Sequence, residues 1–396
     1  MIRVGIYRQI WRAFGVALVL GVSAFGTIAA LRHYELTHAL APTITLATTI
    51  KQPQTPTLAW PSYGQAAIAT EQQGVVATHG AQTPHPTAST AKVITVLAIL
   101  EKRPLKLGEH GATLTMTERD VQLYDDYIAQ DGSTTPVHAG LQLTQYQALQ
   151  AIMLASSNNM ADTLAIWAFG SLETYHVYAN QMVKRLGATH TTIGGDASGL
   201  NPLTTSTAED MARISLAALK HPVIAQIAAQ QTADIPFAGT ITNSNRLLIE
   251  HAEIVGLKTG QTNEAGGNFL LAAKHTSAGQ SQPVVVVVFG AESAKTAILD
   301  SYKLYQSARP YLAYEEILPA GTVVAQYDLL RKKTAHATLK QPLKLWTWSG
   351  RQPQPTIDLQ PITGETADCA EVGSLKYEAV SVPLLLERAN NSCPQG

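Results

Sequence analysis

The sequence first offers chemistry at a serine and a lysine three residues apart, Ser89 and Lys92, directly ahead of an apolar run over residues 93–100. A helix over residues 89–101 places both side chains on one face, one turn apart. In its first turn, free backbone N–H groups and the helix dipole favour a developing negative charge. A serine hydroxyl becomes a nucleophile when a base removes its proton, and a lysine kept neutral by burial and nearby positive charge can be that base. Because Ser-x-x-Lys is common, this pair indicates a nucleophile only if the chain supplies further parts.

A second polar pair, Ser156 and Asn158, interrupts a segment that otherwise has the pattern of two apolar helices. The helices are expected over residues 148–155 and 160–168. A buried helix junction needs polar groups that satisfy the free backbone groups of the helix ends. The functional alternative is a hydroxyl and an amide directed into a cleft.

The elements that must position these groups follow an α+β order, with strands before and after a helical lobe over residues 144–229. A third polar segment, Lys258-Thr259-Gly260, ends one of the later strands. We therefore expect a cleft where the sheet meets the helical lobe. The expected strands are residues 64–69, 74–79, 114–117, 136–143, 254–258, 269–274 and 284–289, and further helices are expected over residues 120–128, 172–186, 210–220 and 294–308.

From residue 310 onward the pattern changes to short alternating runs between Gly, Pro and polar turns, which is typical of a small β-rich domain. No catalytic constellation occurs in this region. Both cysteines of the chain, Cys369 and Cys393, lie here. They can pair outside the cytoplasm, but spacing alone leaves the pairing open. The expected strands are residues 322–328, 336–339, 343–348 and 379–385.

The N-terminus has the pattern of a membrane anchor. Three arginines within residues 1–12 precede 19 uncharged residues, 13–31, which as a helix measure about 28 Å and can cross a bilayer core. This excess of positive charge before the span favours an N-terminus inside the cell. The alternative is a cleaved signal peptide with a small-x-small site at residues 39–41, but Pro42 follows that site and disfavours cleavage. Residues 34–59, rich in Thr and Pro, are expected to form an extended spacer.

The composition argues against several classes of protein. The 396 residues carry a net charge of −1 and only 14% charged side chains, so the chain lacks the basic surface that nucleic-acid binding needs. A hydrophobic fraction of 45% is ordinary for a folded globular protein. The 12 histidines show no metal-ligand spacing, since neither His-Glu-x-x-His nor Cys-x-x-Cys occurs.

In this order, Ser89-x-x-Lys92, Ser156-x-Asn158 and Lys258-Thr259-Gly260 resemble the three motifs of the penicillin-recognising serine enzymes. Over residues 60–308 the chain resembles the D-alanyl-D-alanine carboxypeptidases, which are low-molecular-weight penicillin-binding proteins of the S11 peptidase type. The resemblance implies a β-lactamase/transpeptidase-like α+β domain with an antiparallel sheet flanked by helices. The expected organisation is a cytoplasmic N-terminus 1–12, a transmembrane anchor 13–31, an extracytoplasmic linker 32–59, a catalytic domain 60–309 and a C-terminal β-rich domain 310–396.

The resemblance also implies an acyl-enzyme mechanism on a peptidoglycan stem peptide. Ser89 attacks the carbonyl between two terminal D-alanines, and Lys92 is its general base. Ser156, helped by Lys258, passes a proton to the leaving amine, and water then hydrolyses the acyl-enzyme. β-Lactams acylate the same serine, and neither a metal nor another cofactor is implied.

For the substrate, the resemblance implies a set of contacts around the scissile bond. Asn158 holds a backbone amide of the substrate, and Thr259 with Lys258 binds the terminal carboxylate. The strand through Gly260 pairs with the substrate as an added strand. Backbone N–H groups of the nucleophile and of Gln261 form the oxyanion hole.

Two departures from the family pattern leave the carboxylate-binding group open. Related enzymes often have an arginine where this chain has Ser244, and many have another after the last long strand, where this chain has none. Three possibilities remain for the cation that binds the carboxylate: Arg246, Lys295, or Lys258 without a second cation. Many relatives anchor through a C-terminal amphipathic helix, whereas this chain has the N-terminal span, which places the catalytic domain outside a bacterial cell membrane.

Three other functions stay open at the level of the sequence. A class A-like β-lactamase shares the motifs but needs a glutamate-bearing loop, whereas the corresponding loop here holds Asp196 and no Glu-x-x-x-Asn. A transpeptidase or DD-endopeptidase would act on cross-links. A catalytically silent wall-binding protein would not need the reactive residues that are all present. Neither the oligomeric state nor the residue preceding the two alanines can be read from the sequence.

Overall fold

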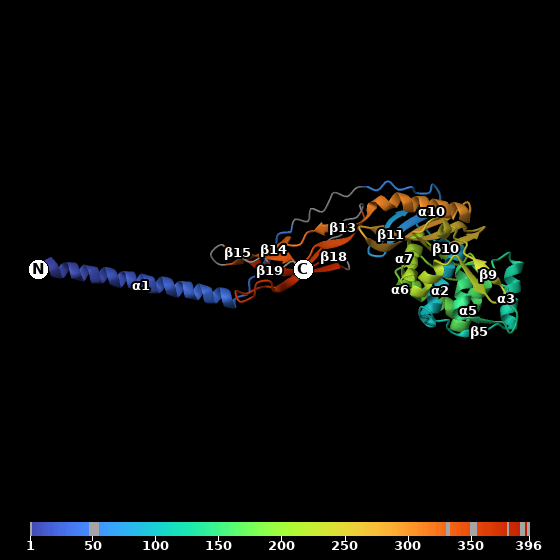
Figure 1. Cartoon of the computed structure of the whole chain (residues 1–396), viewed down its shortest axis with the longest axis horizontal. Helices are drawn as coiled ribbons and strands as arrows, with labels where there is room; N and C mark the ends of the chain where they lie inside the picture. The colour runs from blue at the N-terminus through green and yellow to red at the C-terminus, as the bar shows by residue number, and fades with distance from the viewer. Residues whose placement is uncertain are drawn as a thin grey trace. The chain divides into compact units, whose positions relative to one another are not determined.

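The computed structural model of the chain describes residues 2–46, 55–329, 333–348, 355–377, 380–388 and 393, with the backbone alone for residues 2–10 and 35. The chain separates into two compact units (Figure 1). The α+β unit comprises residues 54–313 and 347–351, and the β unit comprises the N-terminal residues to 53 together with 314–346 and 352–396. The fold class expected from the sequence is confirmed for the α+β unit.

A five-stranded antiparallel sheet is the framework of the α+β unit. The central strand of this sheet is β12 (Gln280–Ala291), and its successive side chains point to opposite faces of the sheet. Val285 and Val287 join the core beneath the helical lobe, and Val284 and Val286 join the core beneath the closing helix. Both faces are therefore covered, which explains the continuous apolar run in this strand. The strand order is β10 (Ile254–Thr262), β11 (Gly266–Ser277), β12 (Gln280–Ala291), β2 (Gln65–Thr70) and β3 (Gly74–His79).

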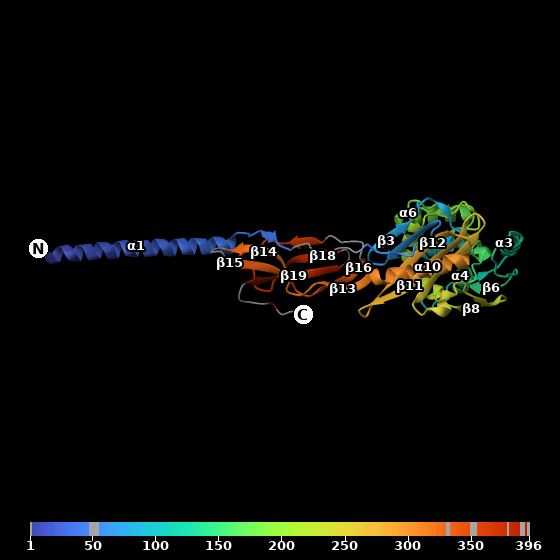
Figure 2. The same ribbon diagram turned by 90° about the horizontal axis from the view of Figure 1, so that it is seen from above.

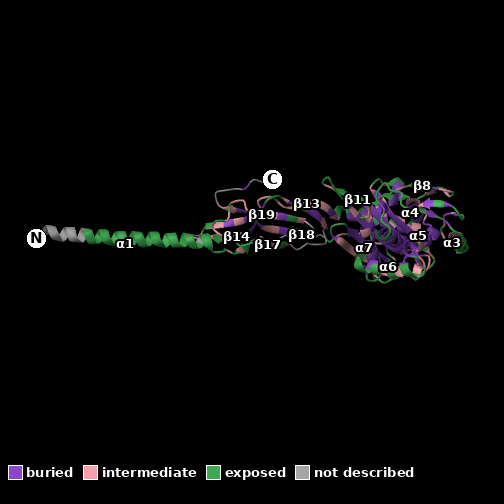
Figure 3. Ribbon diagram, turned by 90° about the horizontal axis from the view of Figure 1, so that it is seen from below, coloured by how far each residue is buried: buried purple, intermediate pink, exposed green. Residues whose placement is uncertain are grey.

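Helices form a layer on each side of this sheet (Figures 1 and 2). Helix α10 (Ala294–Ala308) lies along β11 and β12 on one face, and α7 (Ala208–Leu219) packs against β12 and β2 on the other. Figure 3 shows the buried residues gathered between these layers. Helix α2 (Lys92–Lys102), buried over nearly its whole length, contacts α4, α5, α6 and α7 and so forms the centre of the helical lobe.

Helix α4 begins at a side-chain cap. Thr144 accepts a hydrogen bond from the backbone N–H of Gln147, and the two residues form a capping box at the start of α4. The other bounds are α3 (Glu118–Ala129), α4 (Gln145–Met153), α5 (Asn158–Phe169), α6 (Leu172–Arg185), α8 (Pro222–Ala228) and α9 (Leu247–Glu250), with three short strand pairs, β4 (His85–Pro86) with β7 (Thr205–Ser206), β5 (Thr113–Thr115) with β6 (Gln142–Thr144), and β8 (Thr232–Ile235) with β9 (Gly239–Thr242).

In the α+β unit, two expected elements differ most from the observed ones. The helix expected over residues 89–101 begins only at Lys92, and a separate 3₁₀ turn, η1 (Ala88–Ala91), carries the serine. Ala88, the first residue of this turn, has a φ of 47°, a left-handed conformation that lies outside the α-helical region. Of the strand expected over residues 136–143, only its last two residues belong to β6.

The β unit is built on a six-stranded antiparallel sheet, which confirms the β-rich pattern of the C-terminal region. Its order is β1 (Pro42–Ile44), β14 (Val323–Leu329), β15 (Lys333–Leu339), β19 (Val380–Arg388), β18 (Glu371–Tyr377) and β17 (Thr356–Leu359), and a second pair joins β13 (Leu312–Leu318), preceded by the turn η2 (Arg309–Tyr311), to β16 (Leu343–Trp348). Strand β1 comes from the segment expected to be an extended spacer. Pro42 pairs with Tyr327, so the chain directly after the N-terminal helix is part of this sheet.

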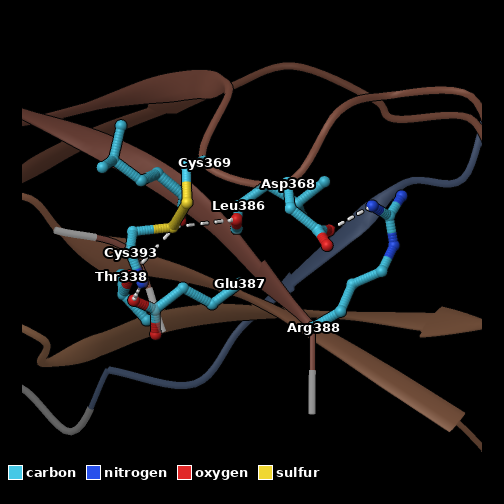
Figure 4. The surroundings of a disulfide bond; sticks show 8 residues. Thr338, Asp368, Cys369, Leu386, Glu387, Arg388 and Cys393 are labelled. Atoms are coloured by element: carbon cyan, nitrogen blue, oxygen red, sulfur yellow. Dashed lines mark hydrogen bonds and ion pairs between the residues drawn. A yellow bond between two sulfur atoms is a disulfide. The ribbon is translucent and has the colours of Figure 1, made fainter. Parts of the chain in front are cut away.

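The two cysteines, whose pairing the sequence left open, form a disulfide in the β unit (Figure 4). The Cα atoms of Cys369 and Cys393 lie 5.4 Å apart, within the range that a disulfide requires. The backbone N–H of Cys393 donates to the Glu387 carboxylate at 3.0 Å, and Asp368 forms an ion pair with Arg388 next to the bond. The disulfide therefore ties residue 393 to the loop that precedes β18.

The N-terminal helix α1 (Ile2–Thr37) contains a stretch that is long and apolar enough, by length and composition, to cross a membrane. This stretch, Trp11–Tyr34, has 24 residues, a mean hydropathy of 2.1 and no buried residue. Figure 3 shows its exposure along the helix. The large apolar side chains of this stretch are exposed in the part of the chain that the structure describes, and the stretch is long enough to cross a bilayer core.

Candidate active site

The serine and the lysine of the first motif are in direct contact. Ser89 lies in η1 and is half-buried, whereas Lys92 at the start of α2 is fully buried. The distance from Lys92 Nζ to Ser89 Oγ is 2.8 Å. A nucleophile and its base at hydrogen-bond distance meet the geometric requirement for general-base activation.

Two other groups hold the amine of Lys92, and both are acceptors. Nζ donates to Oδ1 of Asn158 at 2.7 Å and to the carbonyl oxygen of Ser198 at 3.0 Å. A neutral amine has two N–H bonds and one lone pair. When the two N–H bonds point to these acceptors, the lone pair is left for the hydroxyl of Ser89, as a base requires.

Burial and a neighbouring cation shift the charge state of Lys92. Burial is the main cause that lowers the pKa of Lys92 well below its ordinary value, and the positive charge of Lys258 lowers it further, while Asp196 and Asp162 act in the opposite direction. Burial also lowers the pKa of Lys258 to about 7. Burial and this neighbouring charge therefore both favour the unprotonated form of Lys92 that base catalysis needs.

The second and third motifs meet at another lysine–serine contact. Lys258 Nζ donates to Ser156 Oγ at 3.1 Å and to the Thr259 carbonyl at 3.1 Å. Ser156 has a φ of 60°, a left-handed conformation that is uncommon for residues other than glycine and that concentrates at functional sites. Ser156 lies in the turn between α4 and α5, directly before the N-cap residue Ser157, and its hydroxyl is beside Lys258.

Strand β10 runs close to the nucleophile turn because Gly260 lacks a side chain. A Cβ at Gly260 would lie 3.0 Å from the backbone nitrogens of Ser89 and Thr90, a distance that requires the turn or the strand to shift. Beside it, the hydroxyl of Thr259 lies 2.7 Å from that of Ser244. The third motif is therefore in contact with the first as well as the second.

The segment of the chain that contains these groups matches a known family. The family model of the D-alanyl-D-alanine carboxypeptidases, peptidase S11, matches residues 52–293 of the chain. The chain belongs to this family. The resemblance stated from the motifs is thus confirmed, and the protein is a serine-type peptidase.

This S11 peptidase is similar to curated proteins and to solved structures. It is 31% identical to the D-alanyl-D-alanine carboxypeptidase DacB2 of Mycobacterium tuberculosis over 211 residues, which are 52% of the chain and 67% of that protein. It is 25% identical to DacF of Bacillus subtilis over 271 residues, 66% of each protein. The chain thus spans about two thirds of the length of these curated relatives. The crystal structure of PBP3 from Streptococcus pneumoniae, described as a peptidoglycan synthesis regulatory factor, has a TM-score of 0.62 at 19% identity and covers 85% of the chain and 99% of its own, which shows a shared fold.

In a β-lactamase, the loop that corresponds to the one around Asp196 carries the group that activates water. In this S11 peptidase, the Asp196 carboxylate instead binds backbone groups of its own loop. Oδ1 of Asp196 accepts hydrogen bonds from the backbone nitrogens of Ser198 and Gly199, at 2.7 and 2.6 Å, and Oδ2 accepts from that of Asn201 at 2.7 Å. Its carboxylate thus stabilises the turn of its own loop. This use of both oxygens argues against Asp196 as the base for a fast deacylating water.

The structure brings most of the predicted site residues together through the hydrogen bonds described above. Gln261 is exposed, and its side-chain oxygen accepts from the backbone nitrogen of Ala294 at 2.9 Å, which links β10 to the start of α10. Arg246 at the N-terminus of α9 and Lys295 in the first turn of α10 are both exposed. Sequence reasoning did not identify the carbonyl of Ser198, because a backbone group leaves no residue-type signal.

Proposed function

We propose that this S11 peptidase removes the terminal D-alanine from peptidoglycan stem pentapeptides through an acyl-enzyme on Ser89. The observation that carries the proposal is the hydrogen bond between Lys92 Nζ and Ser89 Oγ, with acceptors holding the other two positions of the amine. A buried, neutral lysine in this geometry has one function open to its lone pair, the removal of the serine proton.

In the acylation step, Lys92 takes the proton of Ser89 while Oγ attacks the carbonyl carbon between the two D-alanines. The carbonyl becomes an oxyanion, which the backbone N–H groups of Ser89 and Gln261 stabilise in our proposal. A donor of this kind contributes on the order of 10²–10³ in rate. The C–N bond then breaks, and in our proposal the proton that Lys92 took from Ser89 passes through Ser156, which Lys258 contacts at 3.1 Å, to the departing nitrogen. This transfer leaves Lys92 neutral again.

The group that receives the substrate carboxylate combines a cation with two hydroxyls in our proposal. Lys258 supplies the positive charge, and Thr259 supplies a hydroxyl whose orientation is set by its 2.7 Å contact with Ser244. Because Ser244 stands where related enzymes often have an arginine, Thr259 contributes more to carboxylate binding here than it would beside that arginine. Asn158 holds a backbone amide of the substrate, and Gly260 allows β10 to pair with it. A β-lactam presents the same carbonyl and carboxylate and acylates the same serine.

Deacylation completes the reaction with water as the acceptor. A water molecule attacks the ester carbon and Lys92 accepts its proton. The bond to Ser89 Oγ then breaks, and Lys92 gives this proton to the serine oxygen. The products are a shortened stem peptide and free D-alanine. The amine of Lys92 ends in the state in which it began, so no group is consumed.

The reaction is tested with a synthetic pentapeptide that ends in two D-alanines. We expect release of one D-alanine per peptide, measured by mass spectrometry of both products. A cross-linked dimer peptide and a chromogenic β-lactam serve as alternative substrates in parallel. Cleavage of the dimer without D-alanine release would instead indicate an endopeptidase, and rapid β-lactam turnover without it would indicate a β-lactamase.

We further propose that the protein is a single-pass protein of a bacterial cell membrane with its N-terminus inside. The apolar stretch Trp11–Tyr34 supports membrane insertion, and the arginines within residues 1–12 support the orientation. The disulfide between Cys369 and Cys393 supports an oxidising compartment for the β unit.

We expect the intact protein in the membrane fraction, with its C-terminal units digested when protease is added to cells stripped of their wall. N-terminal sequencing of the mature protein is the second measurement. A native N-terminus near residue 42 would show a cleaved signal peptide and contradict the anchor.

A further inference from the structure

Helix α5 carries two buried polar residues that point toward the same region. Asn158 and Asp162 are four residues apart, so they lie on one face of the helix, one turn from each other. Both are nearly fully buried, with 2% and 3% of their surface exposed. Asn158 contacts Lys92 directly, whereas Asp162 has no role in the reaction described above.

Asp162 binds the loop that supplies the other acceptor of Lys92. Its Oδ1 accepts from the backbone nitrogen of Ala197 at 2.8 Å, and its Oδ2 accepts from the hydroxyl of Tyr127 at 2.7 Å. The next residue in the loop, Ser198, presents the carbonyl that accepts from Lys92 at 3.0 Å. Asp162 therefore binds Ala197, and Lys92 binds the adjacent residue, Ser198.

Other contacts connect the same short segment to α2 and to the turn η1. The carbonyl of Ala197 accepts from Thr95 Oγ1 at 2.6 Å, and Thr95 lies on α2 one turn after Lys92. Gly199 approaches the nucleophile turn so closely that a Cβ would lie 2.2 Å from the carbonyl oxygen of Ala88. A shift of this segment would consequently be transmitted both to the base and to the turn that carries the nucleophile.

We propose that Asp162 is a positioning residue for Lys92. Asp162 fixes the carbonyl of Ser198 through its hydrogen bond to Ala197, and it places a negative charge near the amine of Lys92. The consequence is that one face of α5 sets both acceptors of the base, Asn158 directly and Ser198 through Asp162. This inference rests on the proposed function, since it assigns Asp162 a role only if Lys92 is the base.

The negative charge of Asp162 raises the pKa of Lys92. Burial raises the pKa of Asp162 to about 6, so its carboxyl is ionised above that pH and favours the protonated form of Lys92. Removing the charge lowers the pKa of Lys92 and extends base catalysis to lower pH. The other titratable groups around the two residues are Lys258 from β10, Asp196 from the same loop, Tyr127 from α3 and Tyr175 from α6.

The test compares Asp162→Asn and Asp162→Ala with the wild type in the rate of acylation by a fluorescent penicillin across pH 5–9. Asparagine can still accept from Ala197 and donate to Tyr127, but it has no charge. We expect Asp162→Asn to remain within about threefold of the wild type at its optimum, with the acid limb moved about one pH unit lower. We expect Asp162→Ala, which loses both hydrogen bonds, to acylate at least about tenfold more slowly.

A matched control is another buried carboxylate that holds a loop elsewhere. Asp210 on α7, 3% exposed, accepts from the backbone nitrogen of His190 at 2.7 Å and from Thr191 Oγ1 at 3.0 Å. Asp210→Asn and Asp210→Ala should lower the melting temperature as the Asp162 variants do, but leave the pH profile of acylation in place. This separates positioning from a general loss of stability.

The outcomes decide between the inference and its alternatives. If the folded Asp162 variants keep both the rate and the pH profile of the wild type, the inference is overturned. If Asp162→Ala does not fold, the pH profile of Asp162→Asn decides, and an unchanged acid limb overturns the inference. If the wild type itself is not labelled at Ser89, the proposed function fails instead, so the two failures are distinguishable.

Discussion

Replacing Ser89 by alanine is expected to abolish covalent labelling by a fluorescent penicillin, together with the release of D-alanine from a pentapeptide. The substitution removes the oxygen that forms the ester, and the neighbouring Lys92 cannot substitute for it because it is fully buried. The decrease in labelling should exceed about 10³-fold, as for the loss of a nucleophile in other serine hydrolases. Gel fluorescence of the purified protein measures labelling, and mass spectrometry of the wild-type adduct locates it.

The control for this variant is Ser171→Ala. Ser171 caps α6 by accepting from the backbone nitrogen of Thr174 at 3.2 Å, so its loss costs about 1 kcal/mol of helix stability without touching the site. Ser171→Ala should be labelled as the wild type is. Equal labelling of the Ser89 variant would show that another residue is the nucleophile.

The second large effect is expected for Lys92→Met, which keeps the length of the side chain and removes the amine. Acylation should fall by about 10²–10⁴-fold, the range that general-base catalysis contributes. The measurement is the second-order rate constant of acylation as a function of pH. In the wild type, the reactive neutral amine increases as pH rises through the pKa of Lys92, so acylation should be lost as pH falls below that pKa. The variant should lack this acid limb.

A surface lysine provides the comparison for this experiment. Lys303 on α10 is exposed and forms an ion pair with Asp300 at 3.0 Å, so Lys303→Met should leave both the rate and its pH dependence unchanged. If Lys92→Met acylates at the wild-type rate with the same acid limb, another group is the base. The assignment of Lys258, whose pKa burial lowers to about 7, would then be reconsidered first.

The elements with a local cause were predictable from the sequence. The apolar run of β12, the capping box at Thr144 and the uncharged N-terminal span each express a pattern within a few consecutive residues. The three motifs were also recognisable, because their residue types and their order along the chain need no structure to be seen. The family followed from them, and the family model over residues 52–293 agrees.

The contacts between the motifs had no such signal. Lys92 reaches Asn158 across 66 residues and Ser198 across 106, and which backbone carbonyl meets a lysine depends on how the whole lobe packs. The same holds for β1, a three-residue strand that pairs with β14 from far away in the chain. Local periodicity does not encode such long-range pairing, since packing selects it among many possible partners.

The backbone of the nucleophile turn shows the same division. The sequence by itself determined that Ser89 and Lys92 are three residues apart and followed by a helix, since spacing and apolar periodicity are local properties. Tertiary packing decided that the serine lies in a separate 3₁₀ turn, with Gly199 and Gly260 pressed against it from two other segments. The left-handed conformations of Ala88 and Ser156 are likewise maintained by these contacts, because a short peptide alone would not hold a non-glycine residue there.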